Sequence, residues 1–431
     1  MPGRWRHVGR RAGLAAAGAA IALVLGIPAA TGADDTPPPP VGLAWGRAIF
    51  APSLTFGYLY DTNLFLQPSS NKPQPDGLMT AQPAFTLTVP FKNSQFRLTD
   101  TLLWRDYAQT VQVAGKWSND AEAALKLVFG SHDIFDASAH AVAGIAETTS
   151  FDPGGEVVFR GESFAFHTEV LSLQRDERGA RGYRLSLQRN ALKFDSTGTN
   201  FFNYRGFDGE VNYLEPVGPN TSVGAGYIGT RYDHFDTSEG ADPHAVFRKE
   251  AGDTALLLLQ GWLSPRQPYH LRLGYEHLGF TGGAVTDFRG IVGLGDLIFV
   301  VGGGSIIQCS VIRQPYRSFF GRDENNVVQN NFYIYNEGSV RFHRPFQRGS
   351  DFGMTVRLSQ TNYTVPVFAG AEFGDLLRRD RTGDLELYGN LAVRERVSFH
   401  ASIKRTRRYS NFPGSDFASM QFFGGFVFGW L

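Results

Sequence analysis

Apolar and polar residues alternate one by one along most of the chain. Leu54, Phe56 and Tyr58 are separated by single small or polar residues, and residues 269–275 repeat the same spacing further on. In a strand, a period of two places the apolar set on one face and the polar set on the other. The pattern therefore predicts an all-β protein whose strands each have one apolar and one polar face.

Eighteen such segments can be delimited, and sixteen is the alternative count because 133–147 and 250–263 are weaker than the rest. Their average spacing leaves room for strands of ~10 residues, the length that crosses a membrane. The predicted strands cover residues 53–63, 77–91, 95–108, 117–129, 133–147, 154–174, 182–195, 201–214, 221–233, 250–263, 269–281, 288–301, 306–317, 330–343, 351–363, 381–393, 397–409 and 417–431.

The connections between these segments alternate in length. Every second connection is short and polar, as at 130–132 and 302–305, whereas those at 234–250 and 318–329 are long. Bacterial outer-membrane barrels combine short periplasmic turns with longer external loops. The pattern predicts a closed transmembrane antiparallel β-barrel, and an even strand count places both termini in the periplasm.

The N-terminus predicts secretion. Four arginines within residues 1–11 precede an uncharged stretch, 12–33, that ends in small residues. A basic start, an apolar centre and a small-residue end are typical of a signal peptide, here residues 1–33. An uncleaved membrane anchor is the alternative. Residues 34–52, with four consecutive prolines at 37–40, are predicted as an extended periplasmic segment, and the barrel as 53–431.

Composition narrows the class of protein. The chain has 41 basic and 41 acidic residues and one cysteine, so neither a nucleic-acid partner nor a disulfide framework is expected. After residue 33 every apolar run is broken by charge before the ~20 residues of a spanning helix. A secreted chain of this kind is either soluble or a closed barrel, and the repeated outward apolar face favours the barrel.

Two short stretches resemble known outer-membrane proteins. Residues 60–65, Tyr-Asp-Thr-Asn-Leu-Phe, resemble the opening of the β-barrel porin type 2 family, and the aromatic-rich end resembles a barrel-assembly signal, although Leu431 follows Trp430. The resemblance implies an outer-membrane barrel, in some members within exopolysaccharide secretion, and carries no catalytic residues. From the residues alone, Asp61 and Asn63 are interpreted as capping the strand where it enters a loop.

No pattern of an enzyme or metal site is present. Nucleophile-elbow, phosphate-loop and zinc-binding motifs are absent from the sequence, and the ten histidines are scattered. We therefore expect neither catalysis nor a cofactor.

The alternation also assigns charged residues to the interior, because Arg or Lys on the lipid face costs about 2–4 kcal/mol at mid-membrane. Asp100 is an exception, since it shares a face with Phe96, Leu98 and Leu102; a bulge, a register slip or a rim position would explain it. Mixed signs favour a solvated wall held by ion pairs over a strongly selective surface. The predicted pore-lining residues are Arg97, Arg105, Lys126, Arg184, Arg272, Glu276, Glu337, Arg341, Arg357 and Lys404.

The resulting hypothesis is a porin-like passive conduit for small hydrophilic solutes. The alternatives are export of a polysaccharide, with Tyr333 and Tyr335 stacking on sugar rings, and a plugged structural or adhesive barrel. Those tyrosines are also interpretable as interfacial or structural residues. Expected partners are outer-membrane lipid, the assembly machinery that reads the C-terminal strand, two further copies in a homotrimer, and polysaccharide.

Overall fold

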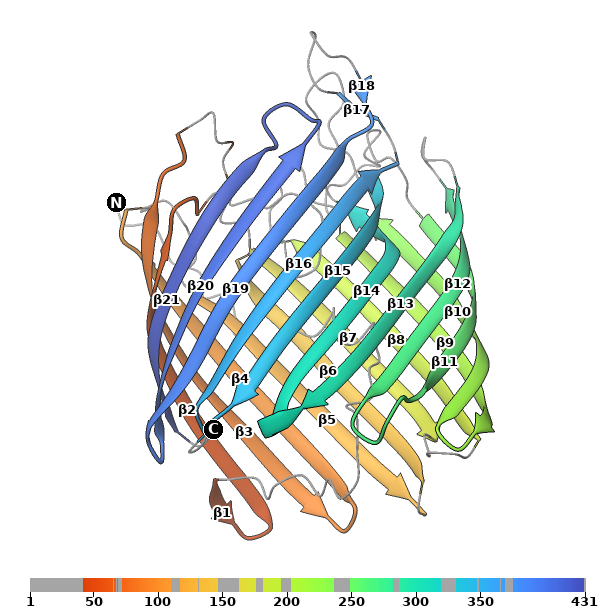
Figure 1. The fold of residues 1–431 in the computed structure, drawn as a ribbon, viewed down its shortest axis with the longest axis horizontal. Helices are drawn as coiled ribbons and strands as arrows, with labels where there is room; N and C mark the ends of the chain where they lie inside the picture. Colours follow the sequence, from red (N-terminus) through yellow and green to blue (C-terminus); the bar gives the residue numbers. More distant parts are fainter. Residues whose placement is uncertain are drawn as a thin grey trace, which may run out of the picture.

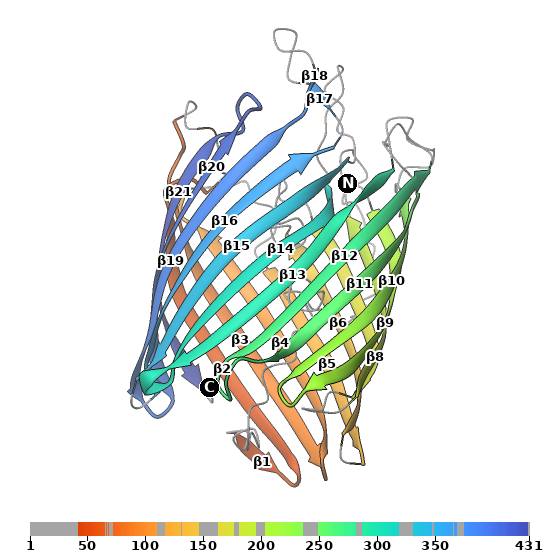
Figure 2. The ribbon, with the colours of Figure 1, turned by 45° about the vertical axis from the view of Figure 1, so that its right-hand side comes forward.

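The alternating segments form strands that close into a ring (Figure 1; Figure 2). The structure, a computed structural model, describes residues 42–64, 66, 68, 72–109, 117–130, 132–145, 163–175, 181–194, 203–235, 249–281, 287–318, 331–346, 349–364, 366–368 and 375–429. The ring has 18 antiparallel strands, which confirms the predicted fold class and the higher of the two strand counts. The predicted signal peptide, residues 1–33, lies outside the described residues.

Most barrel strands follow the predicted segments to within a few residues. In chain order the barrel strands are β2 (Ala48–Asp61), β3 (Asp76–Phe91), β4 (Ser94–Tyr107), β5 (Trp117–Phe129), β6 (Asp133–Ile145), β7 (Ser163–Arg175), β8 (Gly182–Phe194), β9 (Asn203–Gly218), β10 (Thr221–Phe235), β11 (Lys249–Trp262), β12 (Pro268–Thr281), β13 (Phe288–Val301), β14 (Ser305–Ser318), β15 (Asn331–Pro345), β16 (Asp351–Tyr363), β19 (Arg379–Arg394), β20 (Val397–Ser410) and β21 (Phe417–Gly429). However, β2 begins at Ala48, inside the segment 34–52 predicted as an extension, and the predicted strand residues 154–162 lie outside the described residues.

Three short strands and one turn lie outside the ring itself. β1 (Leu43–Trp45) pairs with the start of β2 at the lower edge of Figure 1, while β17 (Val367–Phe368) and β18 (Asp375–Leu376) pair with each other at the opposite end. The 3₁₀ turn η3 (Gly302–Gly304) joins β13 to β14, at the short connection predicted for 302–305. Its Gly303 has φ +72°, a conformation that glycine adopts without steric cost.

The ring closes where the first barrel strand meets the last. β2 pairs antiparallel with β21 from Ser53 opposite Gly429 to Asp61 opposite Gln421, and every other barrel strand pairs with its neighbours in sequence. Closure leaves no open sheet edge in the ring, which is the condition for a sheet to cross hydrocarbon. Within the described part of the chain, a search for apolar helices of membrane-spanning length finds none.

The two faces of the ring differ as the alternation predicted. Leu54, Phe56 and Tyr58 of β2 are 42%, 43% and 48% exposed, and residues paired with them across the sheet share this outer face. Exposed apolar side chains recur on the same face of the other strands, from Leu187 of β8 to Leu391 of β19. Such an apolar belt on a closed barrel is the surface that a membrane-spanning barrel presents to lipid.

Candidate functional site: the barrel interior

The ten charged residues predicted to line the interior all lie on the inner face of the ring. The register sets this, because residues paired across antiparallel strands share a face and the pairing runs unbroken around the barrel. Arg97 alternates with outward Leu98, and Arg272 stands between outward Leu271 and Leu273. Their contribution to solute passage stays a prediction.

These ten residues do not form one cluster, since they come from seven strands around the ring. Arg184, Arg272 and Glu276 lie together around one cavity. Arg357 of β16 pairs with Glu337 of β15 at 3.4 Å. The remaining five are distributed along the wall: Arg97, Arg105, Lys126, Arg341 and Lys404.

The β14–β15 hairpin leaves the wall at residues 314–318 and 331–335, the described residues next to its connection, which are here called the hairpin tip. Pairing between β13 and β14 stops at Gly293 opposite Arg313, whereas β14 and β15 stay paired up to Ser318 opposite Asn331. Phe332 belongs to the outer face of β15 by register, yet its ring stacks on Phe280 of β12 at 4.8 Å between centroids. Because Phe280 lies on the inner face of the barrel, the hairpin tip must lean inward across β12 and β13.

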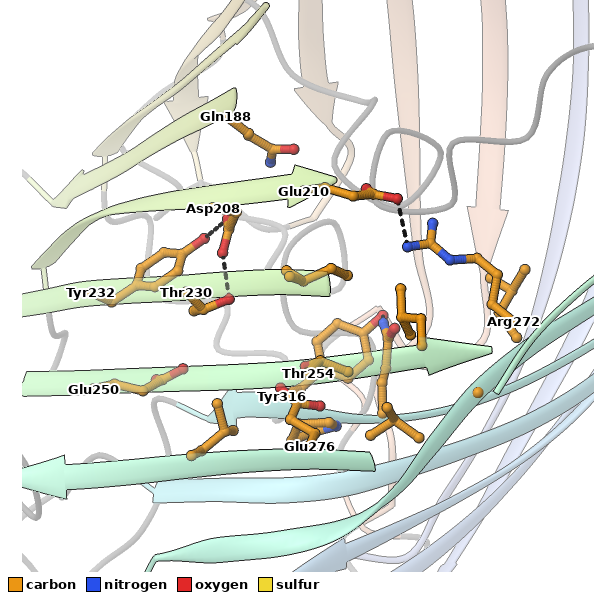
Figure 3. Close-up of a pocket in the computed structure, with 18 of the residues that line it drawn as sticks. Gln188, Asp208, Glu210, Thr230, Tyr232, Glu250, Thr254, Arg272, Glu276 and Tyr316 are labelled. Carbon is orange, nitrogen blue, oxygen red and sulfur yellow. Dashed lines mark hydrogen bonds and ion pairs between the residues drawn. The ribbon is translucent and has the colours of Figure 1, made fainter. Parts of the chain in front are cut away.

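A cavity of about 240 Å³ lies between this tip and the inner wall of β8 to β13 (Figure 3). Tyr316 of the hairpin and Thr254 of β11 both line this cavity (Figure 3). Apolar inward residues such as Leu278 and Phe280 line the part beneath the tip. The lining polar residues are Arg184, Ser186, Gln188, Asp208, Glu210, Thr230, Tyr232, Glu250, Thr254, Arg272, Glu276, Arg313, Gln314 and Tyr316.

An ion pair spans the wall of this cavity. Arg272 Nη2 of β12 donates to Glu210 Oε1 of β9 over 2.7 Å, and the two side chains are 9% and 16% exposed. Glu210 also accepts a hydrogen bond from Asn212, two residues along the same inner face. Charges shielded from water to this degree interact strongly only when they are paired and hydrogen-bonded. The pair therefore holds both side chains in fixed positions.

Asp208 organises a second polar group on the same wall. Its carboxylate accepts hydrogen bonds from Thr230 Oγ1 at 2.9 Å, Tyr232 Oη at 2.5 Å and Asn190 Nδ2 at 3.1 Å. These partners come from β8 and β10, the two neighbours of β9. Figure 3 shows Asp208 and Glu210 pointing to the same side of β9. Carboxylate, hydroxyl and guanidinium groups are thus presented beside apolar surface, which suits small solutes with a polar group and a carbon skeleton.

The two tyrosines considered for sugar stacking are packed against protein. Tyr333 and Tyr335 are 0% and 3% exposed, and their rings contact Tyr316 and, for Tyr333, also Tyr363. Tyr335 donates a hydrogen bond to Glu337 Oε2 at 2.6 Å. Their ring faces are not available to a sugar, so the structural interpretation fits and the stacking interpretation does not.

Asp100 lies on the outer face, and the register explains how. Pairing of β4 with β5 is regular there, with Asp100 opposite Ala121, so neither a bulge nor a slip is involved. Asn119, also on the outer face, donates from Nδ2 to Asp100 Oδ1 over 2.7 Å. A side-chain amide thus partly satisfies a carboxylate that the apolar belt surrounds.

The Tyr-Asp-Thr-Asn stretch of the sequence resemblance has a clear structural role. Asp61 caps the end of β2 by accepting from the Asn63 backbone N–H at 2.8 Å, as predicted. It also accepts from Ser419 Oγ at 2.7 Å and Gln421 Nε2 at 2.8 Å, both on β21. Thr62 and Asn63 bond the β21 backbone as well. The stretch therefore fastens the first barrel strand to the last.

Ring closure, an even strand number, an apolar outer belt and a polar inner face together make the porin-type outer-membrane barrel architecture. This is the architecture that the resemblance at residues 60–65 implies. Among the described residues, no group of histidine, cysteine and carboxylate side chains has the arrangement of a metal site.

Comparison with known proteins gives structural neighbours only, because no protein-family model and no curated protein matches the chain. The outer membrane protein opdK from Pseudomonas aeruginosa is 12% identical, with a TM-score of 0.46, covering 88% of this chain and 99% of that one. A BenF-like porin from Pseudomonas fluorescens Pf-5 is 10% identical, with a TM-score of 0.48, covering 88% and 98%. OpdL of Pseudomonas aeruginosa is 12% identical, with a TM-score of 0.45, covering 90% and 100%. Likeness at this level carries no argument about function, which has to come from the geometry.

Proposed function

We propose that the chain is a passive outer-membrane conduit for small hydrophilic solutes. The observation that carries this proposal is the inner face of the closed ring, where charged and amide side chains replace the apolar residues of the outer face. Charged and amide side chains inside a membrane-spanning barrel are stable only if water solvates them. Barrels of 16 to 18 strands are wide enough to hold a water-filled channel. Solutes then cross down their own gradient.

The β14–β15 tip narrows this path from one side. Its inward lean places Tyr316 and the cavity beneath it inside the ring, so a solute entering from the long-loop end meets this segment. Two lumen arginines are paired with carboxylates, Arg272 with Glu210 and Arg357 with Glu337. Paired charges give little net field, so the conduit discriminates by size and polarity more than by charge sign.

The orientation follows from the loop lengths. The short turns lie in the periplasm with both termini, and the long connections lie outside, as in other outer-membrane barrels. The C-terminal strand β21 serves as the segment that the barrel-assembly machinery recognises, and homotrimers form in the membrane. We propose no catalytic role and no cofactor. We do not propose polysaccharide export, because Tyr333 is buried and its ring cannot stack on a sugar.

A liposome-swelling assay tests the proposal. The refolded protein is placed in vesicles loaded with an impermeant polymer, and the vesicles are diluted into isosmotic solutions of neutral sugars of increasing size. Swelling that is fast for the smallest sugar and absent for large oligosaccharides is expected. Equal and slow swelling with every solute, matching empty vesicles, contradicts a conduit and supports the plugged structural barrel instead.

A further inference from the structure

Four arginines gather on the outer face where β19 and β20 approach their long-loop end. Arg407 lies opposite Gly383, Arg405 opposite Leu385 and Tyr409 opposite Arg381, so these side chains share the lipid-facing side of the sheet with Arg379. All four arginines are exposed. Side chains two residues apart on one strand face, or diagonal across a strand pair, are only about 7–8 Å apart. The four guanidinium groups therefore form one patch, which we name the arginine patch.

The patch borders the apolar belt. Leu385, which lies opposite Arg405, and Ile403, the next outward residue of β20, are 42% and 44% exposed, and Leu358 of β16, opposite Gly383, is 66% exposed. Arg407 packs over the Tyr409 ring at 4.5 Å, and Tyr409 is itself 53% exposed. A tyrosine beside arginines and next to exposed leucines is typical of the depth at which lipid headgroups meet acyl chains.

Some other charged residues of the outer face have protein partners. Glu169 of β7 pairs with Arg189 of β8 at 3.1 Å, and Arg313 of β14 donates to Asn336 of β15 at 2.6 Å. By contrast, none of the four patch arginines has a carboxylate within 4 Å among the residues that the structure describes. The outward residues beside Arg379 and Arg381 on β16 are the neutral amides Asn362 and Gln360. The patch thus carries positive charge that no carboxylate of the described residues neutralises.

We propose that the arginine patch binds the phosphate groups of a phosphorylated glycolipid of the outer leaflet. Guanidinium groups match phosphate oxygens in paired hydrogen bonds, and several in one place suit a ligand with more than one phosphate. The acyl chains of the same lipid lie on the neighbouring Leu385, Ile403 and Leu358. The proposal rests on the proposed outer-membrane location with the long connections outside.

The test uses the full-length refolded protein in detergent, with lipid A and lipid A stripped of its phosphates as probes. Binding is measured by native mass spectrometry for the wild type and for the Arg405→Gln/Arg407→Gln variant. The matched control is Arg231→Gln/Arg289→Gln, which removes two exposed outer-face charges from β10 and β13. We expect at least a tenfold weaker affinity for lipid A in the patch variant, because each arginine near an anionic headgroup contributes about fivefold. The control should stay within twofold of the wild type.

Equal losses in both variants, or equal binding of the dephosphorylated lipid by wild type, would overturn the proposal. A patch-dependent affinity for inorganic phosphate equal to that for lipid A would also overturn the lipid assignment. Arg405→Lys/Arg407→Lys, which keeps the charge without the paired geometry, should bind with intermediate affinity, and heat-modifiable gel migration establishes that each variant is folded. Conductance of the same preparations is measured separately. A folded barrel that binds lipid A without conducting contradicts the proposed function but supports lipid binding by the arginine patch.

Discussion

Asp61 at the end of the first barrel strand accepts a hydrogen bond from Ser419 Oγ of the last strand over 2.7 Å. The carboxylate is 1% exposed and also receives Gln421 Nε2, so it is buried at the one junction that joins residues more than 350 positions apart. Every other strand pair in the ring is local in sequence. The β2–β21 pair joins distant residues, so its formation has the largest loop-closure entropy cost in the ring. The side-chain hydrogen bonds of Asp61 offset part of this cost.

Replacing Asp61 by alanine should therefore destabilise the closed barrel more than loss of an ordinary strand carboxylate. Ser419, Gln421 and the Asn63 N–H each lose an acceptor, and hydrogen bonds to a buried charge contribute about 1.5–3 kcal/mol each, so we expect a loss of about 4–5 kcal/mol, the lower end for three such bonds. Guanidinium unfolding of the protein in phosphocholine vesicles, followed by tryptophan fluorescence, measures it. Asp384→Ala is the control, because Asp384 accepts from Thr406 of the adjacent strand at 2.6 Å and should lose about 1 kcal/mol. If both variants lose the same free energy of unfolding, the hydrogen bonds at the closing junction contribute no more than those of an ordinary strand pair.

The Arg272–Glu210 pair offers a double-mutant cycle. Arg272→Met leaves a largely buried carboxylate without its cation, and such a change destabilises by about 3 kcal/mol. Glu210→Gln/Arg272→Met removes both charges and should be more stable than Arg272→Met alone. The same unfolding assay gives the coupling energy. If the two mutational effects simply add, the pair is solvated and fixes nothing at the cavity.

The inward lean of the hairpin depends on Phe332. Phe332→Ala removes its contacts with Phe280 and Phe288, so the tip should loosen and single-channel conductance should rise or fluctuate between levels. Phe342→Ala is the matched control, since Phe342 is on the same face of β15 lower down, where its ring neighbours Phe352 of the outer belt at 6.4 Å. The control should keep the wild-type conductance. Unchanged conductance in Phe332→Ala would mean that the tip does not obstruct the path.

Removing the charge of Asp100 should stabilise the folded barrel. Asp100→Asn keeps a hydrogen-bonding partner for Asn119 and removes a charge from the apolar belt, where charged side chains are unfavourable by up to a few kcal/mol. We expect about 1 kcal/mol of stabilisation toward guanidinium in vesicles. A loss of stability would place Asp100 in the headgroup region, where its charge is solvated.

Strand positions and faces were predictable because alternation is a local property of the sequence. Leu98 and Arg97 identify opposite faces without any knowledge of partners. The hairpin tip was not predicted, because alternation alone treats Phe332 as a lipid-facing residue. The missed signal is apolar character on both faces: Leu256 and Leu258 point inward between outward Ala255, Leu257 and Leu259. Strands covered on both faces have such continuous apolar runs. Phe332, which lines the same cavity as Leu256, is distant from it in sequence, so the apolar run indicates a cover without identifying it.

The sequence also could not predict contacts that depend on the register between strands. Arg272 and Glu210 are 62 residues apart, and their meeting requires the relative stagger of four strands. Asp61 was identified from its motif, but only the closure of the ring brings Ser419 to it. Alternation fixes which face a side chain lies on, whereas the shear of the barrel decides what it meets there.

Single-channel recording in planar bilayers tests the central claim most directly. Heat-modifiable, refolded protein is added to one side of a lipid bilayer in potassium chloride, and current is recorded at several voltages. The account predicts discrete, ohmic conductance steps that grow with salt concentration, as expected of a water-filled polar lumen. Folded protein that inserts yet gives no steps above the baseline would contradict it.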